Sequence, residues 1–229
     1  MKIRSCTTVV LLLLLAAAAN AQERKLRFEF FGEFVKPWDK EFEITYPQSL
    51  TPIQGQHEFS PGGGGGVRFG IDGAKYWGQD YLYSYSAQAS RIVSDGSRFA
   101  FTNKLHQVCT NILFYPFSLE QESVFPYITA GVGATFVSIS QQTMGAGLDP
   151  TRGNIGPIKG ETIFAFNAGG GIRVRANERF GVRIDIRDYM SRPIRYGLAE
   201  CVTCAASDVF PVSGVFHVMS ASFGLVVYF

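Results

Sequence analysis

The sequence carries little net charge, few histidines and cysteines, and no long apolar run beyond its first 21 residues. Its 229 residues include 21 Lys and Arg, 19 Asp and Glu, three His and four Cys. A chain so close to neutrality lacks the basic face that nucleic-acid binding requires. Because no run of 18 apolar residues follows residue 21, the rest of the chain is not expected to contain a transmembrane helix.

The first 21 residues have the composition of a secretory signal peptide. Lys2 and Arg4 precede an apolar run that is too short to remain as a membrane span, and an A-x-A cleavage site ends at Ala21. We therefore predict that residues 1–21 are removed on export and that residues 22–229 form one domain. The loss of two cations leaves 19 Lys and Arg against 19 Asp and Glu, so the mature domain is expected to be neutral.

What the sequence has in abundance is glycine, aromatic residues and two-residue alternation. It contains 25 Gly, 20 Phe and 10 Tyr. Over segments of about ten residues, apolar side chains alternate with small or polar ones, which is the pattern of a strand between two different environments. Eight strands are predicted, at residues 25–35, 67–72, 80–90, 99–114, 127–140, 161–175, 180–189 and 215–229.

The two different faces of each strand favour a barrel that spans a membrane. In the segment 180–189, Ile184 and Ile186 are apolar, whereas Arg183 and Asp185 are charged. A soluble sandwich or a lipocalin-like barrel would turn its apolar faces inward and would not need charged faces opposite them. The expected fold class is all-β, an eight-stranded antiparallel up-and-down transmembrane β-barrel with apolar faces toward lipid and charged faces toward the lumen.

Several motifs resemble bacterial outer-membrane β-barrels, and in particular the family of small OmpA- and OmpX-like barrels. They lie at 111–116 (NILFYP), 126–133 (PYITAGVG), 169–172 (GGGI) and 180–189 (FGVRIDIRDY), and the last strand ends in Val-Val-Tyr-Phe. As architecture, the resemblance covers the whole mature chain. It implies a monomer in the outer membrane of a Gram-negative bacterium, in contact with outer-membrane lipid and lipopolysaccharide.

The resemblance also implies a role for the last strand. In this family the terminal aromatic residue is part of a signal that the barrel assembly machinery reads. The assembly signal is therefore expected to comprise Phe223, Leu225, Val227, Tyr228 and Phe229.

The predicted connections between strands differ in length in a regular way. If the N-terminus is periplasmic, three of the four outer connections are long, at 36–61, 141–160 and 191–213. This matches the short turns and long outer loops of outer-membrane barrels. The five glycines at 62–66 would suit a phosphate-cradling loop only if a helix followed them, and an alternating segment follows instead.

The face assigned to the lumen collects charges of both signs. An eight-stranded barrel is just wide enough for its side chains to fill, and an unpaired charge inside it would be costly, so we expect these residues to pair. Two interpretations remain open: a structural polar plug, which is favoured, and a gated path for ions or small solutes. The predicted lumen residues are Arg27, Glu29, Glu33, Arg68, Asp72, Arg173, Arg175, Arg183, Asp185 and Arg187.

The cysteines offer few sites for chemistry. Cys201 and Cys204 have a spacing that could ligate zinc, but a structural site needs four ligands. A redox motif of this spacing would belong to a thioredoxin-like unit, which is absent. In an exported chain a local disulfide between them is predicted instead, and Cys109 is expected to be a buried free thiol. No metal and no cofactor are expected.

Histidine gives one weak candidate for catalysis. His217, with Ser213 or Ser220 nearby, is the candidate base and nucleophile at the height of the outer rim. A Ser within a few residues of a His is common by chance, so a lipid A-modifying barrel enzyme is the most distant function considered. The predicted function is a non-enzymatic barrel with a structural or surface-interaction role through its three long outer loops. A narrow pore is the alternative.

Overall fold

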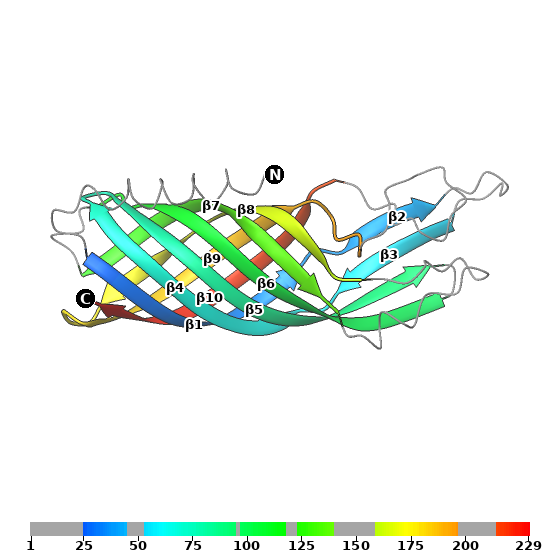
Figure 1. Cartoon of the computed structure of the whole chain (residues 1–229), viewed down its shortest axis with the longest axis horizontal. Coiled ribbons are helices and arrows are strands. Elements are labelled where there is room, and N and C mark those ends of the chain that lie inside the picture. The colour runs from blue at the N-terminus through cyan, green and yellow to red at the C-terminus, as the bar shows by residue number, and fades with distance from the viewer. Residues whose placement is uncertain (1–24, 45–52, 95–96, 118–122, 140–158, 197–213) are drawn as a thin grey trace, which may run out of the picture.

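The computed structural model of the chain describes residues 25–44, 53–94, 97–117, 123–139, 159–196 and 214–229. Within these ranges the chain forms ten β-strands (Figure 1). No helix in them is long and apolar enough to cross a membrane. The strands are β1 (Lys25–Pro37), β2 (Lys40–Ile44), β3 (Ile53–Phe59), β4 (Gly62–Ala74), β5 (Trp77–Ser94), β6 (Ser97–Phe114), β7 (Val124–Ser138), β8 (Glu161–Arg175), β9 (Phe180–Ser191) and β10 (Phe216–Tyr228).

Eight of these strands close into an antiparallel barrel. Neighbours along the wall follow the order β4, β1, β10, β9, β8, β7 and β6, and β5 pairs with both β4 and β6, which joins the two ends of the sheet. In Figure 1 the strands wrap around the long axis, and the start of β1 lies at the same end as the C-terminus. The predicted fold class is confirmed, and each predicted strand corresponds to one strand of the barrel.

The prediction of a loop over 36–61 is wrong. β1 is followed after two residues by β2, and β3 runs into β4 across Ser60 and Pro61. β2 pairs with β3, and β3 pairs with the last residues of β5, so these strands continue the wall beyond the ring (Figure 1). We call β2, β3 and residues 90–94 and 97–103 of the neighbouring strands the β-extension.

Two of the four prolines between residues 36 and 61 lie in the described residues, at positions that strands tolerate, and Pro47 and Pro52 lie outside them. Pro37 is the last residue of β1, and Pro61 lies between β3 and β4. Proline cannot donate a ladder hydrogen bond, and strand ends are positions where that donor is dispensable. Pro37 therefore ends β1 and Pro61 separates β3 from β4, but the sheet continues past both residues.

The five glycines at 62–66 begin strand β4 and do not form a loop. At Gly66 a Cβ atom would lie 2.7 Å from Phe31 Cζ and 2.1 Å from the carbonyl oxygen of Tyr83. The ring of Phe31 occupies the space that a side chain at this position would need. Glycine here allows a large aromatic ring from β1 to pack inside the lumen against the wall.

Side chains alternate between lumen and outside along the barrel strands, as the sequence predicts. On β9, Arg183, Asp185 and Arg187 are each 1% exposed, whereas Ile184 and Ile186 are 58% and 54% exposed. The same alternation runs along β7, β8 and β10. A register shifted by one residue would reverse both faces of a strand, so the predicted assignment of faces is confirmed.

β10 lies between β1 and β9 and completes the ring. Phe223, Leu225 and Phe229 are exposed on its outward face, and Val227 is half-buried on the same face. Tyr228 is buried in the lumen. Four of the five residues predicted as an assembly signal therefore share the outward side, and Tyr228 has a structural contact inside the barrel.

Outward-facing side chains change from apolar to charged toward the β-extension. On β9, Ile186 is followed by Asp188, and on β1, Phe34 is followed by Lys36. Charges that face lipid are costly at the bilayer midplane and cost much less near the interface. These outward charges define a charged rim, which comprises Lys36, Lys104 and Asp188.

Candidate functional site in the barrel lumen

The lumen is divided into two layers along the barrel axis. The layer near the start of β1 holds most of the buried charges, and the layer toward the β-extension holds a cluster of apolar side chains with polar ones such as Gln107 among them. The first layer, which we call the charged network, comprises Arg27, Glu29, Arg68, Asp72, Asp80, Arg173, Arg183, Asp185 and Arg187. The second, the apolar layer, comprises Phe31, Val35, Leu82, Leu105, Cys109, Val137, Ile163, Tyr189, Phe216 and Val218.

One end of the charged network is organised around Asp72 on β4. Arg27 from β1 pairs with Asp72 and with Asp80 of β5. Arg173 from β8 reaches Asp72 at 2.8 Å, and the hydroxyl of Tyr115 donates a hydrogen bond to the same carboxylate at 3.0 Å. Because β8 and β4 are not neighbours in the wall, the Arg173 contact spans the lumen.

The other end is organised around Arg183 on β9. Its Nη1 lies 3.0 Å from Asp80 Oδ2 and 3.3 Å from Glu29 Oε2. Its Nη2 lies 3.1 Å from Asp185 Oδ2. Arg68 binds Glu29 at 2.5 Å from the neighbouring strand. The network therefore connects strands β1, β4, β5 and β9 through side chains inside the barrel.

Charge in the network is nearly balanced. It contains five Arg and four carboxylates, and each carboxylate contacts at least two Arg. Arg187 completes the set with a 2.6 Å contact to Asp185. A buried charge without a partner would be strongly destabilising, so mutual pairing is the condition under which these side chains occupy the lumen.

Two of the predicted lumen residues lie outside the charged network. Glu33 is above it, toward the apolar layer, and accepts a hydrogen bond from Ser220 at 2.8 Å. Arg175 lies at the opposite end, with its guanidinium 5.0 Å from the ring centre of Phe125 and 4.9 Å from that of Tyr228. These distances suit cation–π contacts, so aromatic rings surround this arginine.

Sequence reasoning placed Tyr189 in the lumen but missed the parts that Asp80 and Tyr127 have in the charged network. Asp80 is fully buried and contacts three Arg of the network. A signal for it exists, because Asp80 shares its strand face with Leu82, opposite the row of outward tyrosines on β5. Tyr127 accepts a hydrogen bond from Arg183 Nε at 2.6 Å and donates one to Asp185. The hydroxyl group thereby links two charges of the network.

The end of the lumen at the β-extension is covered by residues 193–196, which follow β9 and which we call the mouth cap. Ile194 and Tyr196 are buried there. The hydroxyl of Tyr196 accepts a hydrogen bond from Asn103 Nδ2 at 2.9 Å and lies 3.1 Å from His57 Nε2. The mouth cap thus joins the barrel strands to the β-extension.

Glu161, at the start of β8, holds the mouth cap from its other side. It accepts a hydrogen bond from the Arg195 backbone N–H at 2.6 Å and pairs with Arg192 at 3.2 Å. Tyr196 has a φ angle of 54°, a left-handed conformation that costs a residue other than glycine about 1–2 kcal/mol. The contacts around Tyr196 and Glu161 offset this cost.

His57 lies beneath the mouth cap, in the β-extension. It is buried, and its Nε2 is 2.6 Å from the Ser90 hydroxyl oxygen. Burial lowers the pKa of His57 from 6.5 to about 3, because desolvation disfavours the charged imidazolium. His57 is therefore a neutral hydrogen-bonding group at neutral pH.

The structure separates the predicted pair of His217 and Ser220. Ser220 lies in the lumen, where it donates to Glu33. His217 lies on the outward face, with its Nδ1 2.6 Å from Asp188 Oδ2 and its ring 4.8 Å from that of Trp38. The two side chains point to opposite sides of the wall, so they do not form a base and nucleophile.

The remaining predicted sites concern thiols and metal ligands. Cys109 is a buried free thiol, as predicted. Ser213, Cys201 and Cys204 lie outside the described residues. Across the part of the chain that the structure describes, no three His, Cys, Asp or Glu side chains are close enough together to hold a metal ion.

No family model matches the chain, and no curated protein matches its sequence. The fold is similar to that of the outer membrane protein OprG from Pseudomonas aeruginosa, with a TM-score of 0.58 and 12% identity over 90% of this chain and 95% of that chain. Neisserial surface protein A gives a TM-score of 0.44 with 12% identity, covering 90% of this chain and 97% of its own. Ail of Yersinia pestis gives 0.41 with 11% identity, covering 91% and 100%. With its closed ring of eight antiparallel strands, the chain has a β-barrel fold similar to that of OprG.

Proposed function

We propose that the chain is an exported outer-membrane protein whose sealed barrel carries the β-extension and the outer loops at the cell surface. The observation that carries this proposal is the filled lumen. The charged network occupies one layer, the apolar layer the next, and the mouth cap covers the end. A barrel filled in this way has its functional surface on the parts that project from the membrane.

The orientation follows from the outward face of the β-extension. Gln56, Glu58 and Arg91 face outward there, and Glu58 pairs with Arg91 at 3.3 Å in an exposed position. Such side chains suit water and not hydrocarbon. Outer-membrane barrels have short periplasmic turns and longer extracellular segments. We therefore assign the β-extension to the extracellular side and the turn at 176–179 to the periplasmic side.

Export and assembly are part of the same proposal. Residues 1–21 serve as the cleaved signal. The barrel assembly machinery recognises the closing strand, on which Phe223, Leu225 and Phe229 face outward. The assembled barrel is a monomer surrounded by outer-membrane lipid and lipopolysaccharide.

Catalysis is not part of the proposed function. A hydrolase of this architecture needs a base and a nucleophile within hydrogen-bond reach of each other. His217 and Ser220 lie on opposite faces of the wall, and the carboxylate of Asp188 occupies the Nδ1 side of the imidazole. The role supported best is structural, with surface interactions through the β-extension and the outer loops.

Planar-bilayer recording of the purified, refolded protein tests the sealed barrel. We expect no stable conductance step, although a porin added to the same bilayer gives one. Heat-modifiable migration of the same sample checks that the barrel is folded. A reproducible single-channel step from the folded protein would replace this proposal with the narrow pore for ions or small solutes.

A further inference from the structure

Lys104 differs from the other cations on the outward surface near the charged rim. Three of those cations have carboxylate partners: Lys36 pairs with Asp39 at 3.5 Å, Arg91 with Glu58 at 3.3 Å and Arg192 with Glu161 at 3.2 Å. Among the residues that the structure describes, no carboxylate lies within ion-pair distance of Lys104. Lys104 is exposed, at the level where the wall passes from apolar to polar.

An ordered imidazole lies beside Lys104 on the same face of β6. The Nδ1 atom of His106 is 3.0 Å from the hydroxyl of Tyr83, and its ring lies 5.0 Å from that of Tyr85. These contacts fix the imidazole and leave Nε2 directed away from the tyrosine hydroxyl. Tyrosines are common at membrane interfaces without any ligand, but an interfacial aromatic belt does not account for a fixed imidazole next to an unpaired ammonium group.

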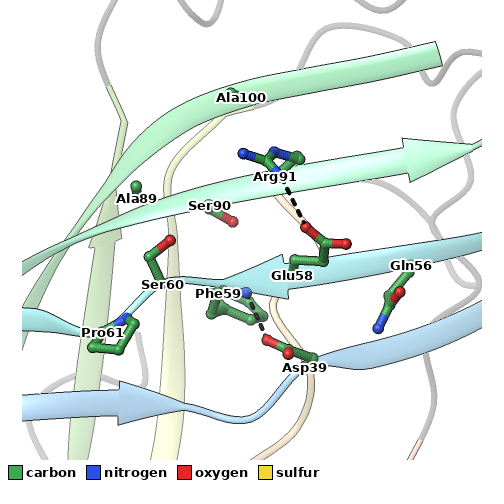
Figure 2. Close-up of a pocket in the computed structure, with 10 residues that line it drawn as sticks. All are labelled: Asp39, Gln56, Glu58, Phe59, Ser60, Pro61, Ala89, Ser90, Arg91 and Ala100. Carbon is green, nitrogen blue, oxygen red and sulfur yellow. Dashed lines mark hydrogen bonds and ion pairs between the residues drawn. The ribbon is translucent and has the colours of Figure 1, made fainter.

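A polar pocket of about 290 Å³ lies between β3, β5 and β6 in the β-extension (Figure 2). Its small side chains are Ala89 of β5 and Ala100 of β6. In the β5–β6 register, Lys104 is opposite Ala87, and Ala89 is opposite Thr102. The pocket therefore begins two residues along the strand from Lys104, which is about 7 Å.

The walls of the pocket offer both donors and acceptors. Gln56 of the β-extension, Ser60 and Asp39 line it, together with the ion pair between Glu58 and Arg91 (Figure 2). Its volume is near the lower end of the roughly 300–1,000 Å³ range of small-molecule sites. Such a pocket has room for one polar ring with several hydroxyl groups.

We propose that this outward face of β5 and β6 binds a membrane lipid whose headgroup is a phosphorylated sugar. Lys104 and His106 hold the phosphate through charge-assisted hydrogen bonds, and the sugar ring occupies the pocket between Ala89 and Arg91. The acyl chains continue along the wall past Tyr85, in the same leaflet. This inference rests on the proposed placement of the β-extension at the cell surface, because a lipid can reach both parts of the site only at the membrane boundary.

Native mass spectrometry of the refolded mature chain in micelles measures lipid binding directly. The probes are lipid A, which is a diphosphorylated glucosamine lipid, and phosphatidylglycerol, which carries phosphate without an amino sugar. We expect saturable binding of one lipid A, tighter than that of phosphatidylglycerol. Inorganic phosphate at the same concentration should not displace lipid A. Displacement by inorganic phosphate would instead make this a site for free anions and would overturn the proposal.

Three variants separate the phosphate from the sugar. Lys104→Gln should weaken the binding of both lipids about tenfold or more, as expected for the loss of a charge-assisted hydrogen bond. Arg192→Gln is the control, because it removes a positive charge from the same end of the barrel where a carboxylate partner already exists, and it should change binding less than about twofold. Ala89→Phe fills the pocket and should weaken the binding of lipid A alone.

The outcomes that contradict the proposal are distinct from a failure of the sealed barrel. Equal losses in Lys104→Gln and Arg192→Gln would mean that only net charge matters, and unchanged lipid A binding by Ala89→Phe would remove the sugar from the site. Heat-modifiable migration of each variant reports folding, and bilayer recording reports the seal. A folded, silent barrel that binds no lipid A would overturn the lipid site and leave the proposed function standing.

Discussion

Asp80→Asn is the sharpest test of the charged network. Asp80 is fully buried and contacts Arg27, Arg183 and Arg187. The substitution keeps the size of the side chain and leaves five Arg facing three carboxylates. Because removal of one partner from a buried ion pair leaves an uncompensated charge, the free energy of unfolding should fall by about 3–5 kcal/mol.

Urea unfolding of the refolded protein in micelles measures this loss. With a slope of about 2 kcal/mol per M urea, the midpoint for Asp80→Asn should fall by about 1.5–2.5 M. Glu58→Gln, which breaks the exposed pair with Arg91, is the control and should cost less than about 1 kcal/mol. If the two variants shift the midpoint equally, the lumen charges do not stabilise the barrel and the reasoning is refuted.

Three more predictions concern the last strand, the outer loop and the mouth cap. Deletion of Phe229 should leave export intact but impair insertion, seen as periplasmic aggregates and loss of heat-modifiable migration. Cys201 and Cys204 should appear as a linked pair in mass spectra of unreduced peptides. Replacing both with Ser should barely move the unfolding midpoint, because so short a ring removes little chain entropy. Since the pKa of His57 is lowered to about 3, only the unfolded chain gains its proton as the pH falls below about 6.5, so the stabilisation present above that pH is progressively lost. Proteolysis at the mouth cap should therefore increase from pH 7 to pH 4.5 in the parent and much less in His57→Phe, and equal increases would contradict this.

The faces of the spanning strands could be predicted from the sequence because lipid places a strict requirement on one side of each strand. Ile184 and Ile186 face outward, and Asp185 between them is buried in the lumen. A slip by one residue would turn Asp185 toward hydrocarbon, where a charge near the bilayer midplane destabilises the barrel. The alternation in polarity therefore permits only one orientation of the two faces of each spanning strand.

The β-extension could not be recognised from the same signal. Gln56 and Glu58 face outward there, and His57 between them is buried, so polar residues occupy both faces. Above the charged rim the outward face meets water, and the contrast that lipid imposes disappears. Four prolines in this segment reinforced the expectation of a loop; Pro37 ends β1, Pro61 separates β3 from β4, and Pro47 and Pro52 lie outside the described residues.

The choice of partners in the lumen depends on barrel closure, which the sequence does not encode locally. Arg183 meets Glu29 across 154 positions in the chain, and Arg173 meets Asp72 from a strand that is not its neighbour. The sequence pattern assigned these residues to the lumen but could not pair them. Asp80 was missed because its strand has tyrosines on one face and small polar residues on the other, so neither face is clearly apolar.

The two layers of the lumen have different roles: the charged network stabilises the barrel, and the apolar layer blocks the passage of ions. The charged network connects strands, so losing Asp80 should destabilise the barrel. Above it, Leu105 and Val137 are direct cross-strand partners in the apolar layer, beside buried polar side chains such as Gln107. An ion that crosses the lumen would have to pass between these packed side chains and lose most of its hydration.

Leu105→Ala combined with Val137→Ala should therefore be the change that opens the barrel to ions. The double variant removes apolar volume between the charged network and the mouth cap, and the space it leaves can admit water. Bilayer recordings should show brief conductance steps for this double variant and none for Asp80→Asn. This holds even though Asp80→Asn removes a carboxylate from among buried arginines. Steps from Asp80→Asn with silence from the double variant would assign the seal to the charges instead. The apolar layer would then contribute packing alone.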